Sequence, residues 1–227
     1  MKAKVFLAIS MIALSVTGVS AQTKVIFGGL SLPNGYFAED EYDKNIISGG
    51  KEGAAGTGFN AGFKYLQSFS DPKLSWFVSA ELLYNGLTSD FKDEAEDKLN
   101  PEDVKFESYF NIPVMAGFNY NLAALSSDVS LWIEAGLGVN CRLLSDFRAE
   151  YDDGGEIELS YDKSFLFAYQ FGGGLTIKNK LMVGLAYYNL GTDKLRGQET
   201  KNNKTDKFKT KKELSATTLA LRVGYIF

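Results

Sequence analysis

The sequence predicts an all-β protein, an eight-stranded antiparallel up-and-down transmembrane β-barrel. The chain is rich in aromatic residues and glycine, with 17 Phe, 12 Tyr and 23 Gly against four Pro. Hydrophobic residues recur at every second position in eight segments, as expected for strands with one apolar face. Short and long connections between these segments alternate strictly, as in a barrel with tight turns at one end and loops at the other.

The first 21 residues are predicted to be a cleaved signal peptide. Lys2 and Lys4 precede an apolar run at residues 5–16, and residues 19–21 (Val-Ser-Ala) form a small-residue cleavage site. The run is too short to be a membrane-spanning helix. Residues 22–227 are then expected to form one barrel domain. Cys141 is the only cysteine, so no intramolecular disulfide is possible.

The strands are expected in chain order with short turns at residues 70–73, 122–128 and 178–180. The long, polar connections at the other end are expected to be loops, at residues 33–57, 89–104, 147–162 and 192–213. The predicted strands are 24–32, 58–69, 74–88, 105–121, 129–146, 163–177, 181–191 and 214–227.

The two faces of these strands decide which side is the interior. A soluble eight-stranded barrel, such as a lipocalin, would turn its apolar face inward and a charged face to water. Here the polar face carries many glycines and few charges, for example Gly136, Gly138, Gly172 and Gly174. Glycine weakens a strand unless something approaches closely, and the narrow lumen of an eight-stranded barrel is such a place. The apolar face is therefore expected to contact lipid. Its aromatic members are Trp76, Phe165, Phe167, Tyr169, Phe171, Tyr187 and Tyr225.

The first strand is less clear, because Gly28 and Gly29 interrupt its alternation and leave its register open. The last strand has a regular pattern up to the final residue and is expected to pair with the first. Closing the barrel in this way gives every backbone group a partner inside the membrane. With eight strands, both termini of the chain are then expected at the short-turn, periplasmic end, and the four long loops are expected to face outside.

The apolar pattern of the last strand resembles the C-terminal signal by which the barrel-assembly machinery recognises bacterial outer-membrane proteins. It consists of Leu221, Val223, Tyr225 and Phe227.

Two segments, "SYFNIPVMAGFNYNL" (108–122) and "LWIEAGLGVNCRLLSDF" (131–147), resemble the small outer-membrane β-barrel family common in Bacteroidetes. The matching features are Tyr109, Ile112 and Pro113, followed by Gly136 and Gly138. Residues 30–37 and 56–65 are also typical of such barrels, whereas position 111 is Asn where an acidic residue is frequent. The resemblance implies a porin-like barrel, similar to outer membrane protein A, in the outer membrane of a Gram-negative bacterium. It implies no particular activity.

Composition weighs against several functions. The chain has no histidine, which outer-membrane enzymes of this architecture generally place beside Ser or Asp, so we expect no enzyme. A Ser–Lys or all-carboxylate mechanism stays open. Acidic clusters at residues 39–43 and 93–103 could hold Ca²⁺, but they lack the spacing of an EF-hand, so solvated acids are expected. No metal or other cofactor is predicted. The net charge of −4 indicates no nucleic-acid partner.

Charged residues on the lumen face are expected to form two layers. The lower layer contains Lys64, Glu81, Glu134 and Arg222, and the upper layer contains Glu107 and Arg142. Charges in a narrow lumen persist only when paired. These layers could simply plug the lumen, or they could form a gate whose partners exchange to open a narrow ion path.

The sequence therefore favours a structural or surface-interaction protein with a plugged lumen. The alternative is a barrel that transports small solutes or apolar molecules, although open aqueous pores belong to larger barrels. The expected partners are outer-membrane lipid and, through residues 192–213, phosphates of lipopolysaccharide or the acidic 93–103 segment. A monomer is expected. The lysines proposed for anion binding are Lys207, Lys209, Lys211 and Lys212.

Overall fold

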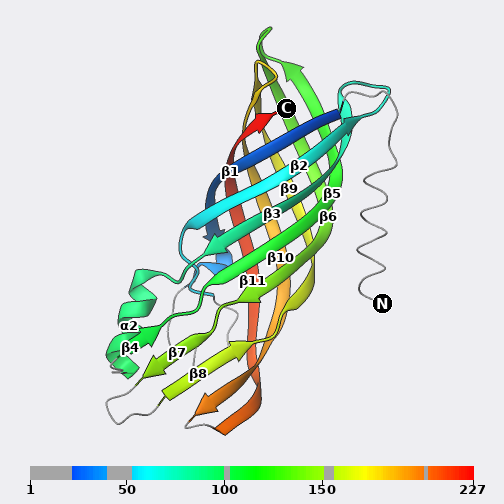
Figure 1. Cartoon of the computed structure of the whole chain (residues 1–227). Helices are drawn as coiled ribbons and strands as arrows, with labels where there is room; N and C mark the ends of the chain where they lie inside the picture. The colour runs from blue at the N-terminus through cyan, green and yellow to red at the C-terminus, as the bar shows by residue number, and fades with distance from the viewer. Residues whose placement is uncertain (1–21, 40–52, 100–102, 151–155, 202–203) are drawn as a thin grey trace, which may run out of the picture.

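A computed structural model describes residues 22–39, 53–99, 103–150, 156–201 and 204–227 (Figure 1). The predicted signal peptide lies outside these residues. Eight antiparallel strands form a closed barrel in which each strand pairs with its neighbours in chain order. They are β1 (Gln22–Asn34), β2 (Gly58–Ser68), β3 (Leu74–Asn85), β5 (Tyr109–Ala124), β6 (Val129–Leu144), β9 (Ser164–Ile177), β10 (Leu181–Lys201) and β11 (Lys204–Ile226).

The last strand closes the barrel against the first, as predicted. Pairing of β11 with β1 runs from Val25 opposite Ile226 to Asn34 opposite Thr217. The other edge of β11 pairs with β10. The start of β1 and the end of β11 therefore lie together at the short-turn end, at the top of Figure 1.

The alternation of side chains separates an outer apolar face from a packed lumen. On β9, Phe165 is 70% exposed and Phe167 66%, whereas Ala168 and Gln170 are fully buried. The aromatic residues expected to contact lipid all fall on this outer face. In β1 the alternation continues through the two glycines, with Phe27 pointing inward and Ile26 and Leu30 pointing outward.

Glycine on the lumen face makes room for one large side chain in particular. Trp132 on β6 lies against Gly174 and Gly184, and a Cβ added to either would come within 2.8 Å of its Cζ2 atom. The lumen of this barrel is thus crowded, which explains why glycine and not a polar side chain recurs there.

The outer connections differ from the expectation of loops. They contain helix α2 (Ser89–Leu99) and the strands β4 (Asp103–Lys105), β7 (Phe147–Glu150) and β8 (Glu156–Tyr161). Strands β10 and β11 also continue through most of residues 192–213, with register shifts near Thr192 and Arg196. Strand β8 does alternate Ile157, Leu159 and Tyr161 with polar residues, but this pattern covers only six positions. A run of that length inside a long polar connection gives a weak strand signal.

These outer elements extend the barrel sheet beyond its rim, at the bottom of Figure 1. The pairing order is β10, β8, β7 and β4. We call this extension, made of the outer part of the β10–β11 hairpin together with β8, β7 and β4, the outer wing. Among the described residues, no helix is long and apolar enough to cross a membrane.

Candidate functional site

The middle of the lumen holds a cluster of buried charges, which we call the lumen charge cluster. It brings together the four residues predicted for the lower layer, Lys64 of β2, Glu81 of β3, Glu134 of β6 and Arg222 of β11. Each side chain is buried, with residue exposures between 0 and 5%.

Glu134 is the centre of the cluster, because both cations contact it. The Lys64 ammonium donates to its Oε2 atom at 2.5 Å, and the Arg222 guanidinium donates to Oε1 at 3.2 Å. Arg222 also contacts Glu81 through a second nitrogen. The hydroxyl of Tyr188 donates to Glu81 at 2.6 Å and contacts Arg222. Two cations thus face two carboxylates, and their formal charges cancel.

Aromatic rings surround the cations. The Lys64 Nζ atom is 5.0 Å from the ring centroid of Phe77 and 5.5 Å from that of Trp132. The Arg222 Cζ atom is 4.7 Å from the centroid of Phe27. Sequence reasoning missed these rings and Tyr188, although each occupies a lumen position of the period-2 pattern. The cations are therefore stabilised by π faces as well as by carboxylates.

The predicted upper layer is organised around backbone carbonyls. Arg142 donates to the carbonyl of Leu214 at 2.8 Å, to that of Gly191 at 2.9 Å and to that of Leu190 at 3.4 Å, and it contacts Asn111. The second predicted residue, Glu107, lies beside Tyr161 of β8, and together with burial it raises the pKa of that hydroxyl. The sequence predicted Glu107 as the partner of Arg142. It did not predict the three backbone carbonyls to which Arg142 donates.

The outer mouth of the lumen is covered by the connection that follows β1. A 3-10 turn, η1 (Gly35–Phe37), places Phe37 in a fully buried position with its ring 5.0 Å from that of Tyr109. The Tyr109 hydroxyl donates to the carbonyl of Gly53 at 2.5 Å. The amide of Ala55 donates to the carbonyl of Phe37 at 2.8 Å. The described ends of this connection are therefore tied to each other and to the barrel.

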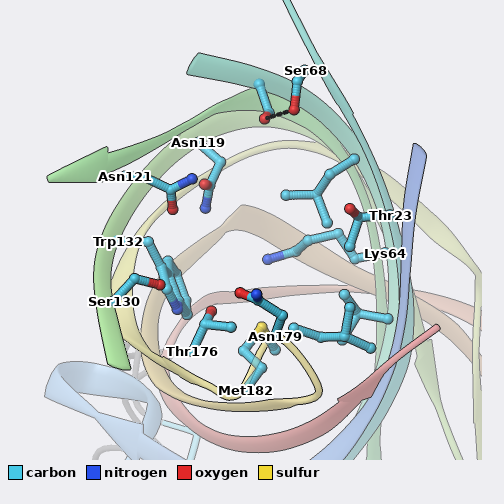
Figure 2. A pocket seen from close by; sticks show the side chains of 14 residues that line it. Thr23, Lys64, Ser68, Asn119, Asn121, Ser130, Trp132, Thr176, Asn179 and Met182 are labelled. Carbon is cyan, nitrogen blue, oxygen red and sulfur yellow. Dashed lines mark hydrogen bonds between the residues drawn. The ribbon is translucent and has the colours of Figure 1, made fainter. Parts of the chain in front are cut away.

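At the opposite, short-turn end the lumen opens into a cavity of about 240 Å³ (Figure 2). Lys64 forms part of its lining, so the lumen charge cluster lies directly beyond the cavity. The lumen thus consists of a covered outer mouth, a charged middle and an open inner end.

The other predicted site residues lie apart from the lumen. Lys207 is exposed on β11, and Lys209, Lys211 and Lys212 belong to the same strand, although their side chains are outside the described part of the chain. The residues of the proposed insertion signal, 221, 223, 225 and 227, share the outer face of the barrel.

The acidic clusters do not form a metal centre in the part of the chain that the structure describes. Most of residues 39–43 lie outside the described residues. Residues 93–99 belong to α2, and Asp103, the last residue of this cluster, begins β4. Within the described ranges, no three His, Cys, Asp or Glu side chains gather closely enough to hold a metal ion.

Comparison with known proteins gives the same fold. The chain resembles the outer membrane protein OprG from Pseudomonas aeruginosa, with 14% identity over 92% of this chain and 98% of that one and a TM-score of 0.53. It also resembles a major outer membrane protein from Thermus thermophilus, with 11% identity over 91% of this chain and 99% of that one and a TM-score of 0.53. Neisserial surface protein A matches at 12% identity over 92% and 98% of the two chains, with a TM-score of 0.46.

Among curated proteins no sequence matches the chain. A family model does match nearly all of it, from residue 5 to residue 227. Its description, an outer membrane protein beta-barrel domain, agrees with the closed barrel and the lipid-facing apolar surface. The chain belongs to the outer membrane protein beta-barrel domain family and is located in the outer membrane.

Proposed function

We propose that this protein is a closed, non-enzymatic barrel that works as a structural and surface-interaction component of the outer membrane. The observation that carries the proposal is the full burial of Arg222 between Glu81, Glu134 and Tyr188. An eight-stranded barrel is only wide enough for side chains to fill it. A paired, hydrogen-bonded cluster across such a lumen would block the passage of hydrated solutes.

Two further observations support this proposal. Phe37 and Tyr109 cover the outer mouth, so the lumen is obstructed at a second level. The outer wing adds sheet that has no role in spanning the membrane, and it offers polar surface to molecules outside the cell. The lack of histidine supports a role other than catalysis.

Conductance in planar lipid bilayers tests the closed lumen. We expect the wild-type protein to insert without stepwise current. We expect Glu134→Gln and Arg222→Gln to remain silent if the cluster is a plug, since the rings of Phe27, Trp132 and Tyr188 still occupy the lumen beside the changed side chain. Steady current steps in the wild type would contradict the proposal.

A narrow transport path is the second candidate function, and the cavity at the inner end favours it. If the lumen charge cluster is a gate, Glu134→Gln should increase the open probability, because Lys64 and Arg222 would lose their shared anion. A matched control is Lys194→Gln on the outer wing, which changes one charge far from the cluster. Absence of current in the wild type, in Glu134→Gln and in Lys194→Gln would exclude the gate and leave the plug.

We also propose that the β10–β11 part of the outer wing binds phosphate groups of lipopolysaccharide. The support is its lysine content, four of the six residues from 207 to 212, and the exposed side chain of Lys207. Such binding is electrostatic and weakens with salt.

A charge-matched pair of variants tests this second proposal. Changing Lys207, Lys209, Lys211 and Lys212 to Gln should lower the affinity for purified lipopolysaccharide by about tenfold or more at low salt. In the control variant Gln replaces four lysines at the opposite, short-turn end of the barrel, which are Lys24, Lys73, Lys178 and Lys180. Equal affinity of the two variants would contradict lipopolysaccharide binding by the outer wing.

A further inference from the structure

The cavity at the inner end of the lumen has two chemically different walls. One wall, from β1, β2, β10 and β11, holds the apolar side chains Val25, Leu66, Met182 and Ile226, with Thr23, Lys64 and Ser68 beside them. The opposite wall, from β5, β6 and β9, is polar. In Figure 2 this second wall presents Asn119, Asn121, Ser130 and Thr176 around Trp132. The cavity is therefore amphipathic and large enough for a small organic molecule.

The deep end of the cavity offers two buried hydrogen-bond donors. Trp132 is 3% exposed, and its Nε1 atom has no hydrogen-bond partner among the described residues. Lys64 is 1% exposed, and Figure 2 shows its amine directed into the cavity toward Trp132. The Lys64 ammonium has three N–H donors, and one of them is used by Glu134. An acceptor on a ligand could therefore be bound by both residues.

Charge around the cavity favours an anionic acceptor. None of the 14 lining residues is acidic. The charge of Lys64, which is part of the lining, is balanced by Glu134 in the lumen charge cluster, so the positive excess comes from the rim of the cavity. Among the described residues of the turns and strand ends at this rim, Lys24, Lys73, Lys178 and Lys180 outnumber Asp71 and Asp128. A field of this sign raises the local concentration of anions.

We infer that this cavity is a binding site, open to the periplasm, for a small organic carboxylate with a short apolar body. The carboxylate would accept hydrogen bonds from Trp132 Nε1 and Lys64 Nζ. The apolar body would lie against Leu66 and Met182. Charge-assisted hydrogen bonds supply the specificity for the anion. The inference does not depend on whether the lumen conducts, because the site lies on the periplasmic side of the lumen charge cluster.

Nuclear magnetic resonance of the full barrel in phosphatidylcholine nanodiscs tests the site. Trp76→Phe, on the lipid face, leaves Trp132 as the single indole, and the methyl group of Met182 gives a second signal from the opposite wall. Titration with sodium butyrate should move both signals saturably. Butanamide, which has the same shape without the charge, should bind at least about tenfold more weakly. Sodium chloride at equal ionic strength should not reproduce the shifts.

Two variants link the signal to the cavity. Leu66→Trp should fill the cavity and abolish the butyrate shift of Met182, whereas Val78→Trp on the outer face of β3 should leave it unchanged. Trp132→Phe removes one donor while keeping an aromatic ring, and should weaken butyrate binding severalfold without affecting the folded barrel's mobility on a gel. Absence of a saturable shift, equal affinity for butanamide, or an unchanged shift in Leu66→Trp would overturn the inference.

Discussion

Neutralising Glu134 is the sharpest test of how the lumen is stabilised. In Glu134→Gln the lumen charge cluster keeps two cations, Lys64 and Arg222, but only one carboxylate. Arg222 retains Glu81 and Tyr188. Lys64 loses the carboxylate at 2.5 Å and keeps its contacts with aromatic rings. Most of the lost stability should therefore come from the unpaired, buried ammonium of Lys64.

The magnitude follows from these contacts. Removing one partner of a buried pair costs about 3–5 kcal/mol, and the remaining cation–π contacts offset about 1 kcal/mol. We expect Glu134→Gln to lower the free energy of unfolding by about 3 kcal/mol, roughly a hundredfold change in the unfolding equilibrium. Urea titration in lipid vesicles, followed by tryptophan fluorescence, measures this difference.

A double variant separates charge imbalance from lost packing. Lys64→Met combined with Glu134→Gln leaves one ion pair, Arg222 with Glu81, and a lumen charge cluster of zero net charge. The double variant should therefore be more stable than either single variant. The surface control is Glu150→Gln, since Glu150 pairs with Arg148 at 2.9 Å while about half exposed, and it should cost less than about 0.5 kcal/mol. The reasoning is refuted if Glu134→Gln costs no more than this control, or if the two lumen substitutions are additive.

Two further predictions concern the wall and the hydroxyl of the cluster. Leu137→Arg places a charge on a side chain that is 61% exposed on the lipid face and should cost about 2–4 kcal/mol of folding stability in lipid; an unchanged urea midpoint would mean that the two faces are assigned wrongly. Tyr188→Phe removes the hydroxyl that contacts Glu81 and Arg222 and should lower the free energy of unfolding by about 1–3 kcal/mol in the same titration. An unchanged free energy would show that Arg222 and Glu81 hold each other without the hydroxyl.

The barrel was predictable because lipid imposes a strict pattern on every spanning strand. Phe165 and Phe167 point outward and Gln170 inward, and the same alternation placed Glu134 and Arg222 on the lumen face. Any charge on that face needs a partner in a narrow interior, so the group of four could be listed from strand positions alone.

Other features left no comparable trace in the sequence. The ligands of Arg142 include the carbonyls of Leu190, Gly191 and Leu214, and a carbonyl is present at every residue. The covering of the mouth by Phe37 depends on hydrogen bonds within a connection, again through backbone atoms. Strand β8 has an apolar face of three residues, Ile157, Leu159 and Tyr161, but it is only six residues long and lies inside a polar connection, so its signal is much weaker than that of a spanning strand.

The continuity of β10 and β11 through the rim of the barrel sets the height at which the protein can meet other molecules. Strand β10 has 21 residues, and a tilted strand needs about 9–11 residues to cross the hydrocarbon layer. About ten residues remain, and at roughly 3.3 Å per residue they span about 30 Å of strand beyond the lipid. The ladder between β10 and β11 shifts register near Thr192 and Arg196, at the base of this arm, and such irregularities bend a strand pair locally. A force applied by a partner at the tip would therefore act first on these two points, before it reaches the barrel wall.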